Sequence, residues 1–429
     1  MGGRAEQAMQ RRQQQQETEG REPDGASLAA MYLYGDVLES VVARVPAPDL
    51  AATARVSREW LRAVRAALRR RPRRLACLVV HLQGVGGRRS AAAYDPHSGA
   101  WLAVPASPRR AAPSHIRLVR GARGDRVCAL SLSGVAVAGD PLGSAMCVAL
   151  PAPGVWRVDP VFAAVGDRVV VIGGACQLAL AEGEDAAAVE VHDGGRWTAC
   201  EPMPDALRES AAATWLSAAA TDKRVYLVER ATGWASWFDP ADRRWGPSRR
   251  VGPDAAFSSW GVAPGRAGAD ERLVLFGAKR ADRDKEAECR VVIQAWEVDG
   301  DTLEPMPSAP SDAMPSEISE RLFPRDEDED EDEDEEDLND KPRAIGVCGN
   351  AAGGYVYNAA EPANGAALYE LREAEEGSAM ARWEWVPCAP AMRAEPLGRA
   401  ILACSPVGLE DQALAAGRRG PRVCTAAGH

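Results

Sequence analysis

The spacing of apolar residues changes near residue 75 and divides the chain into two parts. Before that point, apolar residues recur as they do on one face of a helix: Val37, Leu38, Val41, Val42 and Val45. After it, short β-rich runs are separated by glycine, proline and aspartate, as in DRVVVIGG, KRVYLVER and RLVLFGAK. The pattern predicts a small helical domain followed by a larger all-β domain.

Capping residues divide the first part, residues 31–74, into three predicted helices. Asp36, Asp49 and Ser57 are placed to start them, and Pro46 to end the first. Three short helices make a very small core, and such a unit is marginal alone. We therefore expect its apolar face to be covered by a partner protein, for instance in a helix-binding groove. The alternative is that this face packs on the β domain.

The β-rich part repeats a pattern in which an aromatic residue and an acid precede an indole. Tyr94-Asp95 precedes Trp101 by seven residues, and Phe238-Asp239 precedes Trp245 in the same way. The other expected markers are Trp197 after His192-Asp193, Leu303 after Trp296-Glu297, Trp383 and Trp385 after Tyr369-Glu370, and Trp156 as a degenerate copy. The markers recur about every 50 residues, which is typical of four-stranded propeller blades. We expect the final run, residues 400–407, to complete the first blade and close the ring.

Residues 33–60 resemble the F-box, and the β-rich repeats resemble kelch repeats. The F-box pattern is carried by Leu33, Asp36, Val37, Leu38, Val45, Pro46, Asp49, Leu50, Val56, Ser57, Arg58 and Trp60. Tyr34-Gly35 stands where a proline and an acid are usual. In this order, the two similarities make the chain resemble plant F-box/kelch-repeat proteins. The resemblance implies an α+β multidomain protein, with a small N-terminal three-helix F-box followed by an all-β six-bladed kelch β-propeller.

These patterns set the expected domain boundaries. Residues 1–30 are polar and should form a disordered tail, because they cannot bury enough surface to offset chain entropy. The F-box is expected over 31–74 and the propeller over 75–410, with a disordered acidic insertion at about 311–342. Residues 411–429 would form a C-terminal tail.

The resemblance implies an adaptor, the substrate-recognition subunit of an SCF (Skp1-cullin-F-box) E3 ubiquitin ligase, with no catalytic residue of its own. The F-box would bind a Skp1-like protein, and through it a cullin-RING ligase. The expected contacts are Leu33, Val37, Leu38, Val45, Pro46, Leu50, Val56 and Trp60. The propeller would hold a target for ubiquitination and proteasomal degradation. Some plant members of the family act on phenylpropanoid or flavonoid enzymes, so phenylalanine ammonia-lyase and chalcone synthase are candidate targets.

Aromatic and arginine side chains in loops that lead into blades are candidates for binding the target. Such loops line one face of a propeller, and these residue types make good interface anchors. The candidates are Arg208, Trp215, Arg249, Arg250 and Trp260. Ordinary packing or solvated charge is the alternative reading of these residues.

Charge gives no general argument for a nucleic-acid or membrane partner. Of 62 acidic residues, twelve form the unbroken run Asp326 to Asp337, so the rest of the chain, with 51 Lys and Arg, is nearly neutral. The acidic run is most simply a solvated loop, with a docking strip for a basic partner as the alternative. No apolar stretch approaches the length of a spanning helix, and the N-terminus lacks the apolar centre of a secretory signal. We therefore expect a cytoplasmic and/or nuclear protein.

Metal and redox chemistry find little support in the sequence. The five histidines are not at metal-ligand spacing, and the ten cysteines never form a C-x-x-C pair. We expect no cofactor, and buried thiols in a reducing compartment. Two alternatives to the ligase adaptor remain: a ligase-independent kelch scaffold, and a kelch-fold enzyme such as a copper oxidase or a specifier protein.

Overall fold

The computed structural model divides the chain into two units, a helical one (Met1–Val45, Asp49–Pro72) and a β-rich one (Pro46–Pro48, Arg73–His429). The structure describes residues 35–45, 49–70, 75–84, 89–104, 117–120, 127–131, 134–138, 147–175, 180, 185–252, 256–266, 268, 271–281, 291–306, 311–324, 344–372, 380–394, 399–405 and 422–423. The expected N-terminal tail, Leu33, Pro46 and the acidic run lie outside the described residues.

The helical unit contains the three predicted helices, α3 (Asp36–Val42), α4 (Leu50–Ala54) and α5 (Arg58–Arg70). Both α3 and α4 contact α5. The Ser57 hydroxyl accepts a hydrogen bond from the Trp60 amide at 3.3 Å, as expected of a residue that caps α5. The buried apolar residues are Leu38, Val42, Leu50, Ala63, Val64 and Ala67. This core is small, in line with the sequence expectation.

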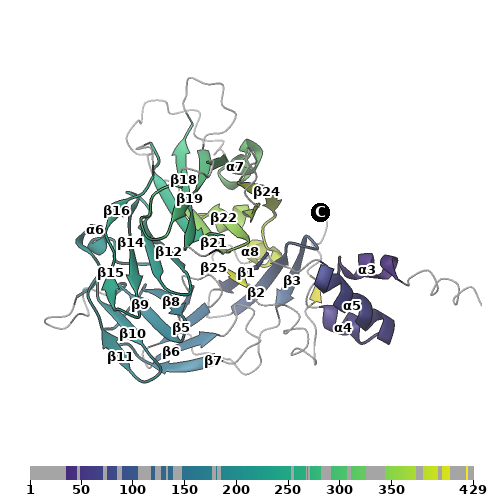
Figure 1. Cartoon of the computed structure of the whole chain (residues 1–429), viewed down its shortest axis with the longest axis horizontal. Coiled ribbons are helices and arrows are strands. Elements are labelled where there is room, and N and C mark those ends of the chain that lie inside the picture. Colours follow the sequence, from purple (N-terminus) through teal and green to yellow (C-terminus); the bar gives the residue numbers. More distant parts are fainter. Residues whose placement is uncertain are drawn as a thin grey trace, which may run out of the picture. The chain divides into compact units, whose positions relative to one another are not determined.

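The β-rich unit consists of six antiparallel sheets, which are the blades of a propeller (Figure 1). Blade one contains β25 (Arg399–Ser405), β1 (Cys77–Gln83), β2 (Arg89–Asp95), β3 (Ala100–Val104) and β26 (Arg422–Val423). Blade two contains β4 (Arg117–Arg120), β5 (Val127–Ser131), β6 (Gly134–Ala138) and β7 (Cys147–Pro151). Blade three contains β8 (Val161–Val165), β9 (Arg168–Ile172), β10 (Val189–His192) and β11 (Trp197–Ala199).

The other three blades follow in chain order. Blade four contains β12 (Leu216–Ala220), β13 (Val225–Glu229), β14 (Trp234–Asp239), β15 (Arg244–Trp245) and β16 (Arg249–Arg250). Blade five contains β17 (Ser259–Pro264), β18 (Arg272–Arg280), β19 (Val291–Asp299) and β20 (Asp312–Ala313). Blade six contains β21 (Ile345–Asn350), β22 (Gly353–Asn358), β23 (Ala366–Leu371) and β24 (Ala381–Val386). Short helices lie between strands: α6 (Asp205–Arg208), α7 (Ser316–Leu322), η5 (Pro362–Asn364) and α8 (Pro390–Ala394).

The innermost strands of the blades form a closed ring. In order they are β25, β4, β8, β12, β17 and β21, and each contacts the next, with β21 returning to β25. The closure comes from β25, which runs antiparallel to β1 with Cys404 opposite Leu78 (Figure 1). The expected completion of the first blade by the last run is therefore confirmed. This completion of blade one removes the open sheet edges that the blades would expose if the ring were not closed.

The aromatic–indole repeat corresponds to pairs of residues on the two outer strands of a blade. Tyr94 lies opposite Trp101, and their ring centroids are 5.5 Å apart. Phe238 and Trp245 form the same pair at 5.2 Å, and His192 and Trp197 at 5.2 Å. The tilted and edge arrangements are those that aromatic rings favour, so each pair stabilises its blade.

Three markers differ from the expectation. Leu303 does not lie opposite Trp296, because it falls in the turn after β19 and outside both β19 and β20. In blade six, Tyr369 lies opposite Trp383, so Trp383 and not Trp385 occupies the repeat position. Trp156 marks no blade, because it lies in the connection between β7 and β8 and outside both strands. Blade two ends with β7 and has no indole there, which is why the repeat is hard to see in that part of the sequence.

Several indoles also tie a blade to the one before it. The indole N–H of Trp101 donates to Pro387 O at 2.9 Å, that of Trp197 to Pro151 O at 2.9 Å, and that of Trp245 to Glu201 O at 3.1 Å. Each acceptor lies at or just beyond the last strand of the preceding blade. These indoles therefore fix neighbouring blades to each other as well as filling space.

The structure differs from the expected insertion over about 311–342. Residues 311–324 belong to blade five, because β20 pairs with β19 and α7 follows it. Met314, Leu322 and Phe323 are buried in the core shared by blades five and six, and this burial orders the segment. At the other end, β26 pairs with β3 inside the stretch expected to be a tail.

Candidate interaction surfaces

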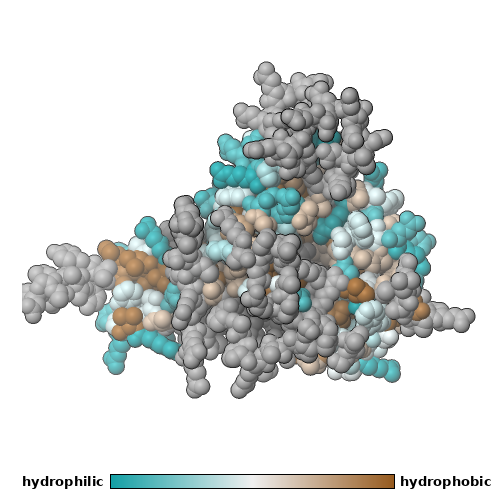
Figure 2. Space-filling view, turned by 180° about the vertical axis from the view of Figure 1, so that it is seen from behind, coloured by the Kyte–Doolittle hydropathy of each residue, from teal (hydrophilic) through white to brown (hydrophobic). Residues whose placement is uncertain are grey.

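The helical unit exposes a set of valines, Val37, Val41 and Val56, which we call the valine surface. Their exposed fractions are 55%, 40% and 63%. Figure 2 shows hydrophobic side chains gathered on this unit. Val37 and Val41 are one helical turn apart, so they share a face of α3. Leu38 and Val42, one position further on, are buried, so α3 presents one apolar stripe to the core and a second to solvent.

The structure separates the expected Skp1 contacts into surface and core. Val37 and Val56 are exposed, whereas Val45 and Trp60 are half-buried. Leu38 and Leu50 are buried at 2% exposure and leave no side-chain surface for a partner, because they form the core on which the helices pack. They support the valine surface from within. Val41 was not among the expected contacts, although its spacing of four from Val37 predicts that the two side chains share one face of the helix.

Four large apolar side chains are exposed on one side of the propeller, and we call them the aromatic face: Trp156, Val158, Trp215 and Trp234. Strands alternate in direction along a blade, so the connection into the innermost strand lies on the same side as the connection between the second and third strands. Trp156 and Val158 precede β8, Trp215 precedes β12, and Trp234 follows the connection from β13 to β14. Their connections therefore open on one side of the ring.

Hydrogen bonds join these connections to one another. The Asp159 carboxylate accepts bonds from the Thr214 amide at 2.8 Å and the Thr214 hydroxyl at 2.5 Å. The Arg230 amide donates to Trp215 O at 2.9 Å. The aromatic face is thus built on connections that are fixed relative to each other, which lowers the entropy cost of binding a partner.

A buried ion pair lies beneath Trp156 and Val158. Arg157 is 2% exposed, and its guanidinium donates to Glu190 Oε2 at 2.8 Å and to Gly173 O at 2.6 Å. Glu190 also accepts a bond from the Gly154 amide at 2.7 Å. Burial lowers the pKa of Arg157, and the Glu190 carboxylate opposes that shift. Since Arg157 points inward, its two neighbours in the chain point outward.

The expected target-binding residues fall into three groups. Arg208 forms ion pairs with Asp185 at 2.9 Å and Asp205 at 3.3 Å. Arg249 and Arg250 are exposed on β16, where Arg250 lies opposite Trp234 and Arg249 pairs with Glu304.

The remaining two of those residues, both tryptophans, differ sharply in exposure. Trp215 is 59% exposed, as a surface anchor requires, but Trp260 is only 3% exposed. Trp260 packs against Phe257 and Trp296 with ring centroids 5.4 and 6.0 Å away, so it is a core residue and its expected surface role is wrong. Trp156, Val158 and Trp234 were not among the expected residues. Trp156 was assigned as a degenerate blade marker, so it was not considered as a binding residue.

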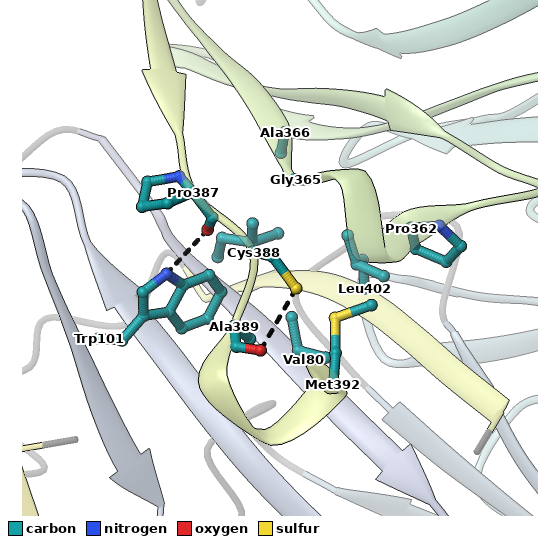
Figure 3. Close-up of a pocket in the computed structure, with 11 residues that line it drawn as sticks. Val80, Trp101, Pro362, Gly365, Ala366, Pro387, Cys388, Ala389, Met392 and Leu402 are labelled. Carbon is teal, nitrogen blue, oxygen red and sulfur yellow. Dashed lines mark hydrogen bonds between the residues drawn. The ribbon is translucent and has the colours of Figure 1, made fainter. Parts of the chain in front are cut away.

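A small apolar pocket lies between blades one and six (Figure 3). Its lining includes Trp101, Leu402, Cys388, Met392 and Pro362. The Trp101 indole and the Cys388 thiol, the latter at 3.3 Å from Ala389 O, both point to backbone carbonyls. Among the residues that the structure describes around this pocket there is no carboxylate, imidazole or amine side chain.

Metal-ligand clusters and spanning helices are absent from the described parts of the chain. No three His, Cys, Asp or Glu side chains there lie close enough together to hold a metal ion. Nor does any helix within those same ranges combine the length and apolar character needed to cross a membrane.

The fold and its surfaces define a closed six-bladed β-propeller protein with a separate three-helix unit. The chain is 30% identical over 395 residues to an F-box/kelch-repeat protein of Arabidopsis thaliana. The aligned region covers 89% of this chain and 91% of that protein. It therefore belongs to the plant F-box/kelch-repeat proteins. No protein-family model matches the chain. Among solved structures, hydrazine synthase of Kuenenia stuttgartiensis aligns with 66% of this chain and 73% of its own, at 11% identity and a TM-score of 0.34, which is too low to carry an argument.

Proposed function

We propose that this protein is the substrate-recognition adaptor of an SCF-type E3 ubiquitin ligase and carries out no bond chemistry itself. The observation that carries the proposal is the valine surface, a set of exposed apolar side chains on the helical unit of an F-box/kelch protein. A unit with so small a core gains stability when a partner covers such a surface. A Skp1-like protein is the proposed partner, and through it the cullin-RING ligase.

Docking buries Val37, Val41 and Val56 in an apolar groove of the Skp1-like protein. Burying a valine side chain that was exposed contributes about 1.5 kcal/mol. The half-buried Val45 and Trp60 are further proposed contacts, as are Leu33 and Pro46, which lie outside the described residues. A few such side chains supply enough free energy for a specific interface when they cluster together.

The aromatic face is the proposed target site. Tryptophan and arginine dominate the binding energy of protein interfaces, and here Trp215, Trp234 and Arg250 lie on the same side of blade four. Phenylalanine ammonia-lyase and chalcone synthase are the proposed targets. Binding raises the effective concentration of a target lysine near the ubiquitin-loaded enzyme, so the adaptor acts by proximity. We place this activity in the cytoplasm and/or the nucleus.

Co-purification with a Skp1-like protein tests the adaptor role. We expect the double variant Val37→Asp, Val56→Asp to lose at least tenfold in affinity, because two carboxylates would have to be desolvated in an apolar interface. Val148→Asp is the matched control, since Val148 is also 55% exposed but lies on β7 of the propeller. Wild-type protein that fails to bind at micromolar concentration would favour the ligase-independent scaffold instead.

A second double variant, on the aromatic face, distinguishes the two surfaces. After proteasome inhibition, proximity labelling with Trp215→Ala, Trp234→Ala should lose the target while retaining the Skp1-like protein. Absence of phenylpropanoid enzymes from the wild-type labelled set would reject the proposed targets and leave the adaptor role standing. An undiminished target signal in the tryptophan variant would instead reject the aromatic face as the binding site.

A further inference from the structure

The seam where blade six meets blade one carries two thiols at close range. Cys348 lies on β21 and Cys404 on β25, the strand that closes the ring. Their sulfur atoms are 3.2 Å apart, and both side chains are buried. An S–S bond is about 2.05 Å long, so the sulfurs need to approach by only about 1 Å to become bonded.

Strand register selects Cys348 over Cys77 as the partner of Cys404. Cys404 lies opposite Leu78 on β1, and directly opposed residues share a face of the sheet. Cys77 is the next residue along β1, so its side chain points to the other face. Leu78, Cys348 and Cys404 accordingly belong to one core cluster.

The ring closes inside blade one, where β25 pairs with β1, and the seam is the junction at which this closing strand meets β21 of blade six. It is crossed by the Trp101 bond to Pro387 O and by a 2.8 Å bond from the Tyr355 hydroxyl to Ala76 O. Among the residues that the structure describes, strand β25 is hydrogen-bonded to a neighbouring strand on one side only, where it pairs with β1. Ring closure therefore depends on non-covalent contacts of a strand that pairs on a single edge.

We propose that Cys348 and Cys404 are a redox modification site, at which a disulfide fixes the closing strand β25 to β21 of blade six. The oxidant is a low-molecular-weight disulfide such as oxidised glutathione. One protein thiolate attacks it, forming a mixed disulfide and releasing one glutathione thiolate. The second protein thiolate then attacks the mixed disulfide and releases the second glutathione. Two protein thiols are oxidised, one small disulfide is reduced to two thiols, and the protons pass to the leaving thiolates.

Burial makes the reaction depend on local opening of β25. A thiol in apolar surroundings ionises poorly and is shielded from the oxidant. Segments at the ends of a fold open more readily than its centre, and β25 is the last innermost strand. Oxidation should therefore accelerate at urea concentrations below the unfolding transition. Once formed, the bond closes a loop between positions 56 residues apart and constrains the unfolded chain.

The test uses the full-length protein, reduced and then incubated with oxidised glutathione in sub-denaturing urea. Peptide mapping without reduction should find a Cys348–Cys404 link. The midpoint of thermal unfolding should rise by about 5 °C relative to the reduced protein and fall back when reductant is added.

Single alanine variants complete the test. Cys348→Ala and Cys404→Ala should each lose both the link and the rise, and either one suffices if the other does not fold. Cys128→Ala is the matched control, because Cys128 is equally buried but lies on β5 of blade two, and it should keep both. A link between other cysteines, no link at any urea concentration below unfolding, or a rise that persists in Cys404→Ala would overturn the proposal.

Discussion

The helical unit and the propeller both expose large apolar side chains, but they support them in different ways. In α3 the exposed Val37 and Val41 lie beside the buried Leu38 and Val42 on the same short helix. On the propeller, Trp156 and Trp215 lie in connections between blades. A local helix with a small core supports the first surface, and polar contacts between distant segments support the second.

This difference determines how each surface responds to substitution. The valine surface depends on the helical period and on a few core residues nearby in sequence. The aromatic face depends on Glu190 and Arg157, which are 33 residues apart, and on Asp159 and Thr214, which are 55 apart. A single change in the polar network should therefore damage the aromatic face while leaving the valine surface intact.

Glu190→Ala is expected to have the largest effect, and it should impair the aromatic face without changing the valine surface. It leaves the Arg157 guanidinium buried without its counterion, which costs about 4 kcal/mol of the propeller's unfolding free energy. Urea denaturation measures that loss. The freed 152–160 connection should also weaken target binding, whereas binding of the Skp1-like protein should not change.

An exposed ion pair of the same kind provides the control for Glu190. Arg249 and Glu304 are both more than 40% exposed in their side chains. Glu304→Ala should cost less than about 1 kcal/mol, because water solvates the remaining arginine. A loss for Glu190→Ala as small as that for Glu304→Ala would show that the buried pair does not hold the connection.

Leu38→Ala tests the other side of the comparison. Removing this buried side chain leaves a cavity in a very small core and should destabilise the helical unit by about 3 kcal/mol. Val37→Ala, one residue earlier and exposed, should change stability by less than about 0.5 kcal/mol. Amide hydrogen exchange should show faster exchange in α5 for Leu38→Ala and no change in the propeller strands. Equal effects of the two variants would mean that α3 does not divide its apolar residues into a core stripe and a surface stripe.

The sequence was sufficient for features that repeat or that depend on near neighbours. The three helices followed from helical spacing, but of the three predicted caps only Ser57 makes a capping hydrogen bond: the N-cap of α3 is Gly35 instead of Asp36, and Asp49 caps α4 without a side-chain bond. The blades followed from the Tyr94–Trp101 type of pair, which is a contact between adjacent strands. Ring closure by β25 followed from the final β-rich run, residues 400–407, which has no blade of its own. Trp156 and Trp260 were misassigned because their burial depends on long-range packing. Nothing near Trp260 in sequence indicates that Trp296 covers it, and nothing near Trp156 indicates that Arg157 anchors its connection to Glu190.

The smallest expected effect concerns the indoles that join neighbouring blades. Trp245 and Trp383 are both half-buried and lie opposite an aromatic residue, Phe238 and Tyr369 respectively. The Trp245 N–H donates to Glu201 O. That of Trp383 is buried without an acceptor among the residues that the structure describes.

Replacing either indole with phenylalanine removes similar volume, so the difference between the two variants isolates the hydrogen bond. Trp245→Phe should cost about 1 kcal/mol more than Trp383→Phe, because it leaves a carbonyl without its donor while the second change removes an unsatisfied N–H. Paired urea denaturation curves measure this difference. Equal losses would mean that the indoles join the blades by packing alone, and the propeller's polar contacts would then matter only where they are buried as ion pairs.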